Sequence, residues 1–270
     1  MMKQLLFTLS GCFLLTGCAG QGINENMMIV AHRGGASLGP ENTLTCIRAG
    51  IASGADMIEI DVHLTADGQA VVCHDETIDR TTDGKGRIEN LTLAQVREAH
   101  IRDAAPEERI PTLAEVLQEV KGKCGLLLEV KKTRDDEYPG IEEKILEELD
   151  RADMRRNRVV IQSFNGSVLE RFHALDPGLP LEKLLVCRVF GKWAIDIRLS
   201  PFSLESYKYV QSINCYAPLL SRRFIEKIHA AGIQVKAWTV DSPDKVPAGV
   251  DGVITDCPDQ FVEARKRAKD

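Results

Sequence analysis

The chain has 270 residues, of which 44% are hydrophobic and 27% are charged, so it can bury a substantial core as one large domain or two smaller ones. Its formal net charge of -6 argues against a nucleic-acid-binding protein, because such proteins need clustered Lys and Arg that acids do not balance.

The N-terminus has the features of an export signal. Lys3 precedes an apolar run over residues 5–15, which is too short to span a bilayer. The run closes with Leu-Thr-Gly-Cys at residues 15–18, which resembles a bacterial lipobox. This resemblance implies that residues 1–17 are a lipoprotein signal peptide and that the mature protein begins at a lipidated Cys18. The alternative is a plain secretory signal with an incidental cysteine.

Residues 18–26 are polar, contain glycine and lack periodic apolar positions, so they predict a tether that leads to a folded domain over residues 27–270. Ala19 and Gly20 follow the cysteine instead of an acidic residue, which in a bacterium with two membranes favours the periplasmic face of the outer membrane. We therefore expect the protein to be exported and to be anchored to a membrane by acyl chains at its N-terminus.

Short apolar runs alternate with amphipathic segments along the rest of the chain. They lack strict polar alternation, as parallel strands do when both faces are covered. No glycine-rich dinucleotide turn follows the first run, so the alternation predicts a (β/α)8 TIM barrel and not a doubly wound sheet. The runs lie at residues 27–31, 56–62, 70–73, 124–130, 158–164, 183–189, 212–217, 233–240 and 251–256.

These nine runs compete for the eight strand positions of such a barrel. The runs at 183–189 and 212–217 are the weakest candidates. The segment 61–71 is too short for a helical crossover, so the third run is expected to return in extended form around the turn at residues 66–68. The charged, turn-rich segment 75–109 predicts a small insertion above the barrel, after the third strand.

Polar residues stand at the ends of the first four runs. In a barrel these ends share the face on which barrel enzymes place their active sites. Residues i and i+2 of a strand point the same way, so the two acids of the second run share one direction, as do the acid and the lysine of the fourth. The residues are, in chain order, His32, Glu59, Asp61, His74, Glu129 and Lys131.

The three acids, Glu59, Asp61 and Glu129, would repel one another if they met without compensation. A hard divalent cation, Mg²⁺ or Ca²⁺, relieves such repulsion through oxygen ligands. Zinc would more typically recruit His or Cys. The sequence therefore predicts a site for one divalent cation.

His32 and His74 can take and give a proton near neutral pH, which provides the base and the acid that phosphodiester cleavage requires. Arg33 and Lys131 would place positive charge beside the predicted cation, where it suits the non-bridging oxygens of a phosphate. His63 shares strand alternation with Asp61, so it is a further candidate to approach the site.

Seven segments in order resemble the glycerophosphodiester phosphodiesterase family. They are AHRG with PENT, EIDVHLTADGQAVVCHD, IPTLAEVL, LLEVK, QSF, AWTVD and DGVITDCPD, and they extend over residues 31–258. The resemblance implies a TIM barrel that hydrolyses glycerophosphodiesters to sn-glycerol 3-phosphate and an alcohol. The family mechanism implies that a glycerol hydroxyl attacks phosphorus, the alcohol leaves, and water then opens a cyclic phosphate.

The resemblance also implies roles for individual residues. Asp241 departs from the form of the motif that has Asn, and residues 171–216 resemble the family weakly, which leaves the headgroup alcohol open. Glu41 is expected to orient His32 or to begin the first helix, where the helix dipole favours a carboxylate. The matched positions are Glu59, Asp61 and Glu129 for the metal ligands, His32 and His74 for the acid and base, Arg33 and Lys131 for phosphate binding, and Trp238 for an aromatic wall near the glycerol.

The leading hypothesis is a metal-dependent glycerophosphodiesterase with a small-molecule substrate. A lysophospholipase D-like lipid phosphodiesterase on the same barrel is the second, because the predicted anchor would place the protein near lipids. A non-catalytic, lipid-anchored binding protein is the third. The choice between Ca²⁺ and Mg²⁺, the division of acid and base roles and the oligomeric state stay open.

Overall fold

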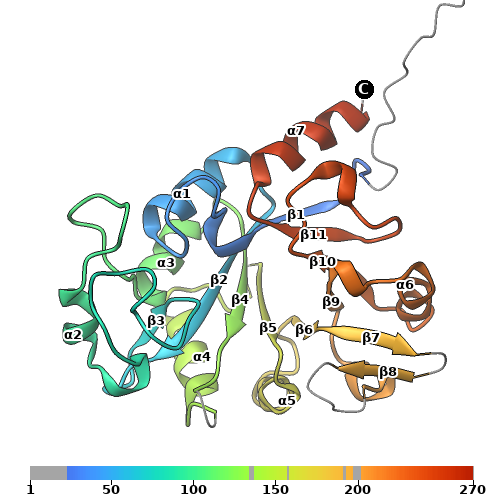
Figure 1. Ribbon diagram of the computed structural model, residues 1–270. Helices are drawn as coiled ribbons and strands as arrows, with labels where there is room; N and C mark the ends of the chain where they lie inside the picture. The colour runs from blue at the N-terminus through green and yellow to red at the C-terminus, as the bar shows by residue number, and fades with distance from the viewer. Residues whose placement is uncertain (1–22, 134–136, 157, 191–192, 197–201, 270) are drawn as a thin grey trace, which may run out of the picture.

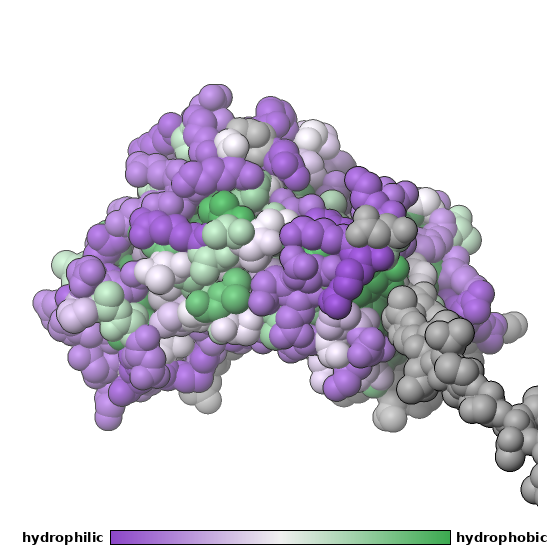
Figure 2. All heavy atoms as spheres, turned by 90° about the horizontal axis from the view of Figure 1, so that it is seen from above, coloured by the Kyte–Doolittle hydropathy of each residue, from purple (hydrophilic) through white to green (hydrophobic). Residues whose placement is uncertain are grey.

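The structure is a computed structural model that describes residues 23–133, 137–156, 158–190, 193–196 and 202–269. The predicted signal peptide, Cys18 and the first part of the tether lie outside the described residues. Where the chain is described, it contains no helix that is both long and apolar enough to span a bilayer. Hydrophilic side chains cover most of the face seen in Figure 2, with hydrophobic side chains in small groups between them.

Parallel strands form a closed barrel at the centre of the molecule (Figure 1). The first strand pairs with both the second and the last, which closes the ring. The predicted (β/α)8 fold is confirmed. Within the described ranges, the eight barrel strands are β1 (Met28–Ala31), β2 (Met57–Leu64), β4 (Gly125–Val130), β5 (Val159–Ser163), β6 (Leu181–Leu185), β9 (Ser212–Tyr216), β10 (Gln234–Trp238) and β11 (Gly252–Thr255).

Helices surround the barrel and bury their apolar sides against the outer faces of the strands. Two of them begin at threonines that the sequence places before an apolar period. Thr43 accepts a hydrogen bond from the backbone N–H of Cys46, and Thr112 forms a reciprocal capping box with Glu115. The helices are α1 (Leu44–Ser53), α3 (Leu113–Val120), α4 (Ile141–Arg151), α5 (Gly166–Leu175), α6 (Arg222–His229) and α7 (Pro258–Lys269).

The run that does not join the ring is the third. β3 (Ala70–Val72) pairs antiparallel with β2, so the extended return after the second run is confirmed. The runs at 183–189 and 212–217, the weakest strand candidates in the sequence, do join the ring, because they supply β6 and β9. Both strands carry polar side chains that meet in the barrel interior, which explains why they look weak as parallel strands.

A small substructure follows β3. It contains α2 (Leu93–Glu98) and packs around its own hydrophobic cluster, which includes Ile78, Ile88 and Val96. It lies at the edge of the barrel beyond β2 (Figure 1). The limits of 75–109 for the insertion stay a prediction. A second short addition, the antiparallel hairpin of β7 (Cys187–Phe190) and β8 (Trp193–Asp196), follows β6.

The close approach of α1 to the turn η1 (His32–Gly34) generates a first prediction. A Cβ atom on Gly50 would lie 2.2 Å from the carbonyl oxygen of Gly34, so Gly50→Ala must push the turn away from the helix. We expect the free energy of unfolding in urea to fall by about 1–3 kcal/mol, the usual range for overpacking. Ala52→Ser, on the exposed side of the same helix, should change it by less than about 0.5 kcal/mol. Equal stability of the two variants would contradict the constraint.

Candidate active site

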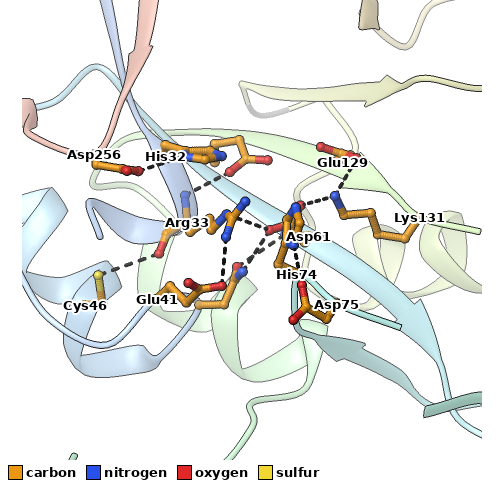
Figure 3. A network of polar contacts seen from close by, with 12 residues as sticks. His32, Arg33, Glu41, Cys46, Asp61, His74, Asp75, Glu129, Lys131 and Asp256 are labelled. Atoms are coloured by element: carbon orange, nitrogen blue, oxygen red, sulfur yellow. Dashed lines mark hydrogen bonds and ion pairs between the residues drawn. The ribbon is translucent and has the colours of Figure 1, made fainter. Parts of the chain in front are cut away.

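The predicted site residues lie at the carboxyl ends of the barrel strands, and Figure 3 shows how those that it labels face one another. The turn η1 after β1 carries His32 and Arg33, β2 carries Glu59 and Asp61, and His74 follows β3. Glu129 belongs to β4 and Lys131 follows that strand, whereas Trp238 ends β10. The i, i+2 alternation that the sequence predicted for β2 and β4 therefore brings acids from different strands together.

Glu59, Asp61 and Glu129 form an acidic group that could hold a metal ion. All three are buried, and they offer ligand atoms that lie within 4.8 Å of one another. Burial, followed by the charge of Asp61, raises the pKa of Glu59 to about 8. Burial also acts to raise the pKa of Asp61, but the charges of Lys131, His74 and Arg33 outweigh it and lower that pKa. Glu59 therefore needs further positive charge nearby to be ionised beside Asp61.

The donor set fits a hard divalent cation, because the group consists of carboxylate oxygens and contains no sulfur or imidazole ligand among the described residues. Neighbouring side chains hold these oxygens in place. Asn42 Nδ2 donates to Asp61 Oδ2 at 2.8 Å, and Lys131 Nζ donates to Glu129 Oε1 at 2.7 Å. Lys131 Nζ also lies 2.8 Å from Asp61 Oδ1.

Arg33 lies on the opposite side of Asp61 from Lys131 (Figure 3). Its backbone N–H donates to Glu59 Oε2 at 2.9 Å, and its Nε lies 3.8 Å from an oxygen of Asp61. The residue adopts a positive φ of 51°, which turns its backbone N–H toward Glu59. The positively charged side chains of Arg33 and Lys131 thus lie on two sides of Asp61. Such charges suit the binding of a phosphate group beside a metal ion.

His32 is oriented by Asp256, which the sequence interpretation missed. Its Nδ1 lies 2.7 Å from Asp256 Oδ1. Burial acts to lower the pKa of His32, but the hydrogen bond with Asp256 and the charge of Glu59 outweigh it, so the pKa is raised. Asp256 is held in turn, because its backbone N–H donates to Asp241 Oδ1 at 2.8 Å. The position of Asp256 directly after the last strand, within DGVITDCPD, was the available signal.

Glu41 does not orient His32, so that expectation was wrong. Its carboxylate accepts hydrogen bonds from Arg33 at 3.0 Å and from Arg80 at 2.7 and 2.8 Å. It does not begin the first helix either, because Thr43 is the N-cap. The physical reason is the path of the loop after η1, which carries Glu41 toward the guanidinium groups and leaves His32 beside the end of β11.

His74 carries the same kind of partner as His32. Its Nδ1 lies 2.7 Å from Oδ1 of the adjacent Asp75, whose Oδ2 accepts from Arg80 Nε at 2.6 Å. Burial acts to raise the pKa of Asp75, but the hydrogen bonds from Arg80 and His74 outweigh it and lower the pKa to about 2. In both histidine-carboxylate pairs the carboxylate contacts Nδ1 and fixes the ring, which leaves Nε2 for proton transfer.

His63 contacts the backbone of His74. It is buried, its Nδ1 lies 2.8 Å from the Tyr138 hydroxyl, and its Nε2 lies 3.3 Å from the backbone carbonyl oxygen of His74. Burial lowers the pKa of His63 to about 4, so the ring is neutral at pH 7. His63 therefore approaches the site through the backbone of His74, and it does not belong to the acidic group.

Trp238 forms part of an aromatic wall at the ends of β5, β9 and β10. Its ring centroid lies 5.5 Å from that of Phe164 and 5.2 Å from that of Tyr216. Its indole Nε1 donates to the backbone carbonyl of Asn214 at 2.8 Å, which fixes the ring.

A cavity of about 550 Å³ opens beside His74, Glu129 and Lys131. Most of the residues that line it are polar and include hydroxyl and amide side chains, whereas Val130 and Phe164 are its hydrophobic members. The full lining consists of His63, His74, Asp75, Glu76, Thr77, Glu129, Val130, Lys131, Lys132, Thr133, Ser163, Phe164 and Asn165.

Comparison with known proteins gives a consistent result. The model of the glycerophosphoryl diester phosphodiesterase family matches residues 32–260. The chain is 35% identical to a glycerophosphodiester phosphodiesterase of Caldanaerobacter subterraneus subsp. tengcongensis, with 87% of this chain and 96% of that protein covered. It is 32% identical to one of Bacillus altitudinis, with 89% and 99% covered. A phosphodiesterase of Oleispira antarctica, solved with the product sn-glycerol-3-phosphate, superimposes with a TM-score of 0.76 at 26% identity, covering 88% of this chain and 96% of that one.

The pairing of His32 with Asp256 can be tested by titration. In the cation-free protein, Asp256→Asn removes the carboxylate that raises the pKa of His32, so we expect this pKa to fall. The imidazole resonances of labelled protein, followed by NMR against pH, report it directly. Asp251→Asn is the matched control, because Asp251 pairs with His229 and should leave His32 unchanged. A His32 pKa that stays the same in Asp256→Asn would contradict the pairing.

Proposed function

This chain belongs to the glycerophosphoryl diester phosphodiesterase family, and we propose that it uses a divalent cation and the pair His32 and His74 to hydrolyse glycerophosphodiesters to sn-glycerol 3-phosphate and an alcohol. The observation that carries the proposal is the buried acidic group beside two histidines, each with a carboxylate on Nδ1. The relatives named for this activity and the product complex of the Oleispira antarctica enzyme support the substrate class.

The residues of the site divide the reaction between them. Arg33 and Lys131 bind the non-bridging oxygens of the phosphate. One histidine accepts the proton of the attacking hydroxyl at Nε2, and the other donates a proton to the oxygen of the departing alcohol as the bond from phosphorus to that oxygen breaks. When the attacking group is a glycerol hydroxyl, the same two histidines exchange roles as water opens the cyclic phosphate.

Glu59, Asp61 and Glu129 would hold the cation, which when bound supplies positive charge to the phosphate and to the attacking oxygen. Oxygen ligands suit both Ca²⁺ and Mg²⁺. Ca²⁺ is the cation that we favour, because its flexible coordination accepts carboxylates at varied geometry and an exported site would meet it in abundance.

The polar lining of the cavity beside His74 supports a small polar alcohol as the leaving group. In the lysophospholipase D alternative the same headgroup alcohol leaves, and the acyl chain stays on the glycerol side of the phosphate, where it would require an extensive apolar lining. We also propose that the protein acts outside the cytoplasm while anchored through Cys18, since the lipobox-like residues 15–18 and the polar tether support that location.

The test of the reaction uses the full chain with glycerophosphocholine, glycerophosphoethanolamine and lysophosphatidylcholine. We expect sn-glycerol 3-phosphate from the first two with Ca²⁺ or Mg²⁺ and none after EDTA treatment. His74→Ala should lower kcat at least about 100-fold, the usual scale for a proton-transfer residue. Enzymatic determination of glycerol 3-phosphate measures both effects.

His229→Ala is the matched control, because His229 also pairs with an aspartate but lies on α6 and contacts Asp251, which precedes β11 at the opposite end of the barrel. Turnover that survives EDTA would refute the metal role, and near-normal activity of His74→Ala would remove that residue from the mechanism. If lysophosphatidylcholine were the only substrate turned over, the result would favour the lipid phosphodiesterase hypothesis. If no substrate were turned over, the result would favour the binding-protein hypothesis.

The anchor has its own test. Cys18→Ala removes the sulfur to which the lipid would be attached, so in the bacterium that produces the protein we expect it to move from the membrane fraction to the soluble fraction. Immunoblotting of the two fractions measures the change. Cys257→Ala, a half-buried thiol far along the chain, is the control. A Cys18→Ala protein that remains in the membrane fraction would refute the lipobox reading.

A further inference from the structure

We propose that Gln162, Asn214, Glu182 and Lys236, here called the interior network, position the carboxylate of Glu59 for the divalent cation. The inference rests on the proposed function, because it is there that Glu59 serves as a cation ligand. Among these four residues, Gln162 is the one that contacts Glu59 in the structure, and the other three act through it.

The interior network is a continuous series of hydrogen bonds across the barrel. Gln162 Nε2 donates to Glu59 Oε1 at 3.2 Å. Asn214 Nδ2 donates to Gln162 Oε1 at 2.9 Å and to Glu182 Oε2 at 2.8 Å. Lys236 Nζ donates to Glu182 Oε1. The residues belong to β5, β9, β6 and β10, so four consecutive strands of the ring connect to the ligand on β2.

Burial makes the orientation of each group in this series energetically important. Gln162 and Lys236 are 1% exposed, and Asn214 and Glu182 are 0% exposed. Bulk water therefore cannot compensate an amide that turns the wrong way, and a buried polar group without its partner is costly. Each amide must take the orientation that satisfies its neighbours.

Only one set of orientations satisfies the whole series. The carboxylate of Glu182 accepts hydrogen bonds, so Asn214 must turn its NH2 group toward it, and the Ser212 hydroxyl accordingly donates to Asn214 Oδ1 at 2.9 Å. The same NH2 group then requires the oxygen of Gln162, which leaves the NH2 group of Gln162 to face Glu59. A reversed Gln162 would place its carbonyl oxygen against a carboxylate.

Glu59 is consequently held from two sides. Gln162 donates to Oε1, while the backbone N–H of Arg33 donates to Oε2 at 2.9 Å. These two donors set the rotation of the carboxylate that faces Asp61 and Glu129. Partners that orient metal ligands in this way commonly change metal affinity about 10–100-fold when they are removed.

The buried ion pair of Glu182 with Lys236 is not explained by stability. Replacing a buried ion pair with well-packed hydrophobic residues is often neutral or stabilising, and barrel interiors are usually filled by Val, Ile and Leu. The pair instead supplies a fixed acceptor at one end of the series, with its charge compensated by the lysine. That acceptor is what determines the direction of both amides.

The test measures the dissociation constant of Ca²⁺ and of Mg²⁺ by isothermal titration calorimetry on the full chain without substrate. Asn214→Leu removes the donors that orient Gln162 but does not touch Glu59, and we expect the dissociation constant to rise about 10-fold or more. The double variant Glu182→Gln/Lys236→Met, which leaves no buried charge unpaired, should raise it in the same direction. It keeps the proposal testable if Asn214→Leu does not fold.

Ile213→Ala is the matched control. Ile213 neighbours Asn214 on β9, but it belongs to the hydrophobic cluster between strands and helices, so its truncation should lower the melting temperature and leave cation affinity unchanged. Variants that fold and bind the cation like the wild-type chain would overturn the inference, as would an equal loss of affinity in Ile213→Ala. A wild-type chain that binds neither cation would instead refute the metal role in the proposed function.

Discussion

The mutual repulsion of three buried carboxylates is the constraint on which the rest of the site depends. Glu59, Asp61 and Glu129 are buried and offer oxygens within 4.8 Å of one another, and no single cationic side chain balances three negative charges. Arg33 and Lys131 compensate part of this charge from opposite sides. Such a group adds little to folding stability by itself, which agrees with the cation-binding role proposed for it.

The two histidines are tied to this charge balance by side chains from distant parts of the chain. Asp61 faces Arg33, Arg33 binds Glu41, and Glu41 shares Arg80 with Asp75, the partner of His74. Arg80 belongs to the segment after β3, so that segment contributes to the electrostatics of the barrel mouth. On the other side, Asp241 holds Asp256, and Asp256 holds His32. Alternating charges thus connect the acids to His74, whereas a hydrogen bond from the Asp256 backbone to Asp241 holds the partner of His32.

The polar interior of the barrel connects fold and site. Glu182, Asn214 and Lys236 occupy positions that apolar residues would normally fill. Glu182 on β6 and Asn214 on β9 interrupt the apolar pattern of these strands, and the sequence interpretation ranked the corresponding runs as the weakest candidates. The same residues meet Gln162, and through it Glu59, in the folded ring. The polar residues that interrupt the hydrophobic pattern of these strands are therefore the ones that form hydrogen bonds across the barrel interior.

The barrel class, the acids on β2 and β4 and the histidines after the first and third runs could be predicted from the chain alone, because alternation within a strand and the shared end of parallel strands are local regularities. The partners of these residues became visible in the folded protein. Asp256 meets His32 across 224 residues because β11 closes the ring against β1, and Glu41 turns to the arginines because the loop after η1 carries it away from His32. Such pairings depend on ring closure and loop path, which no spacing along the chain encodes.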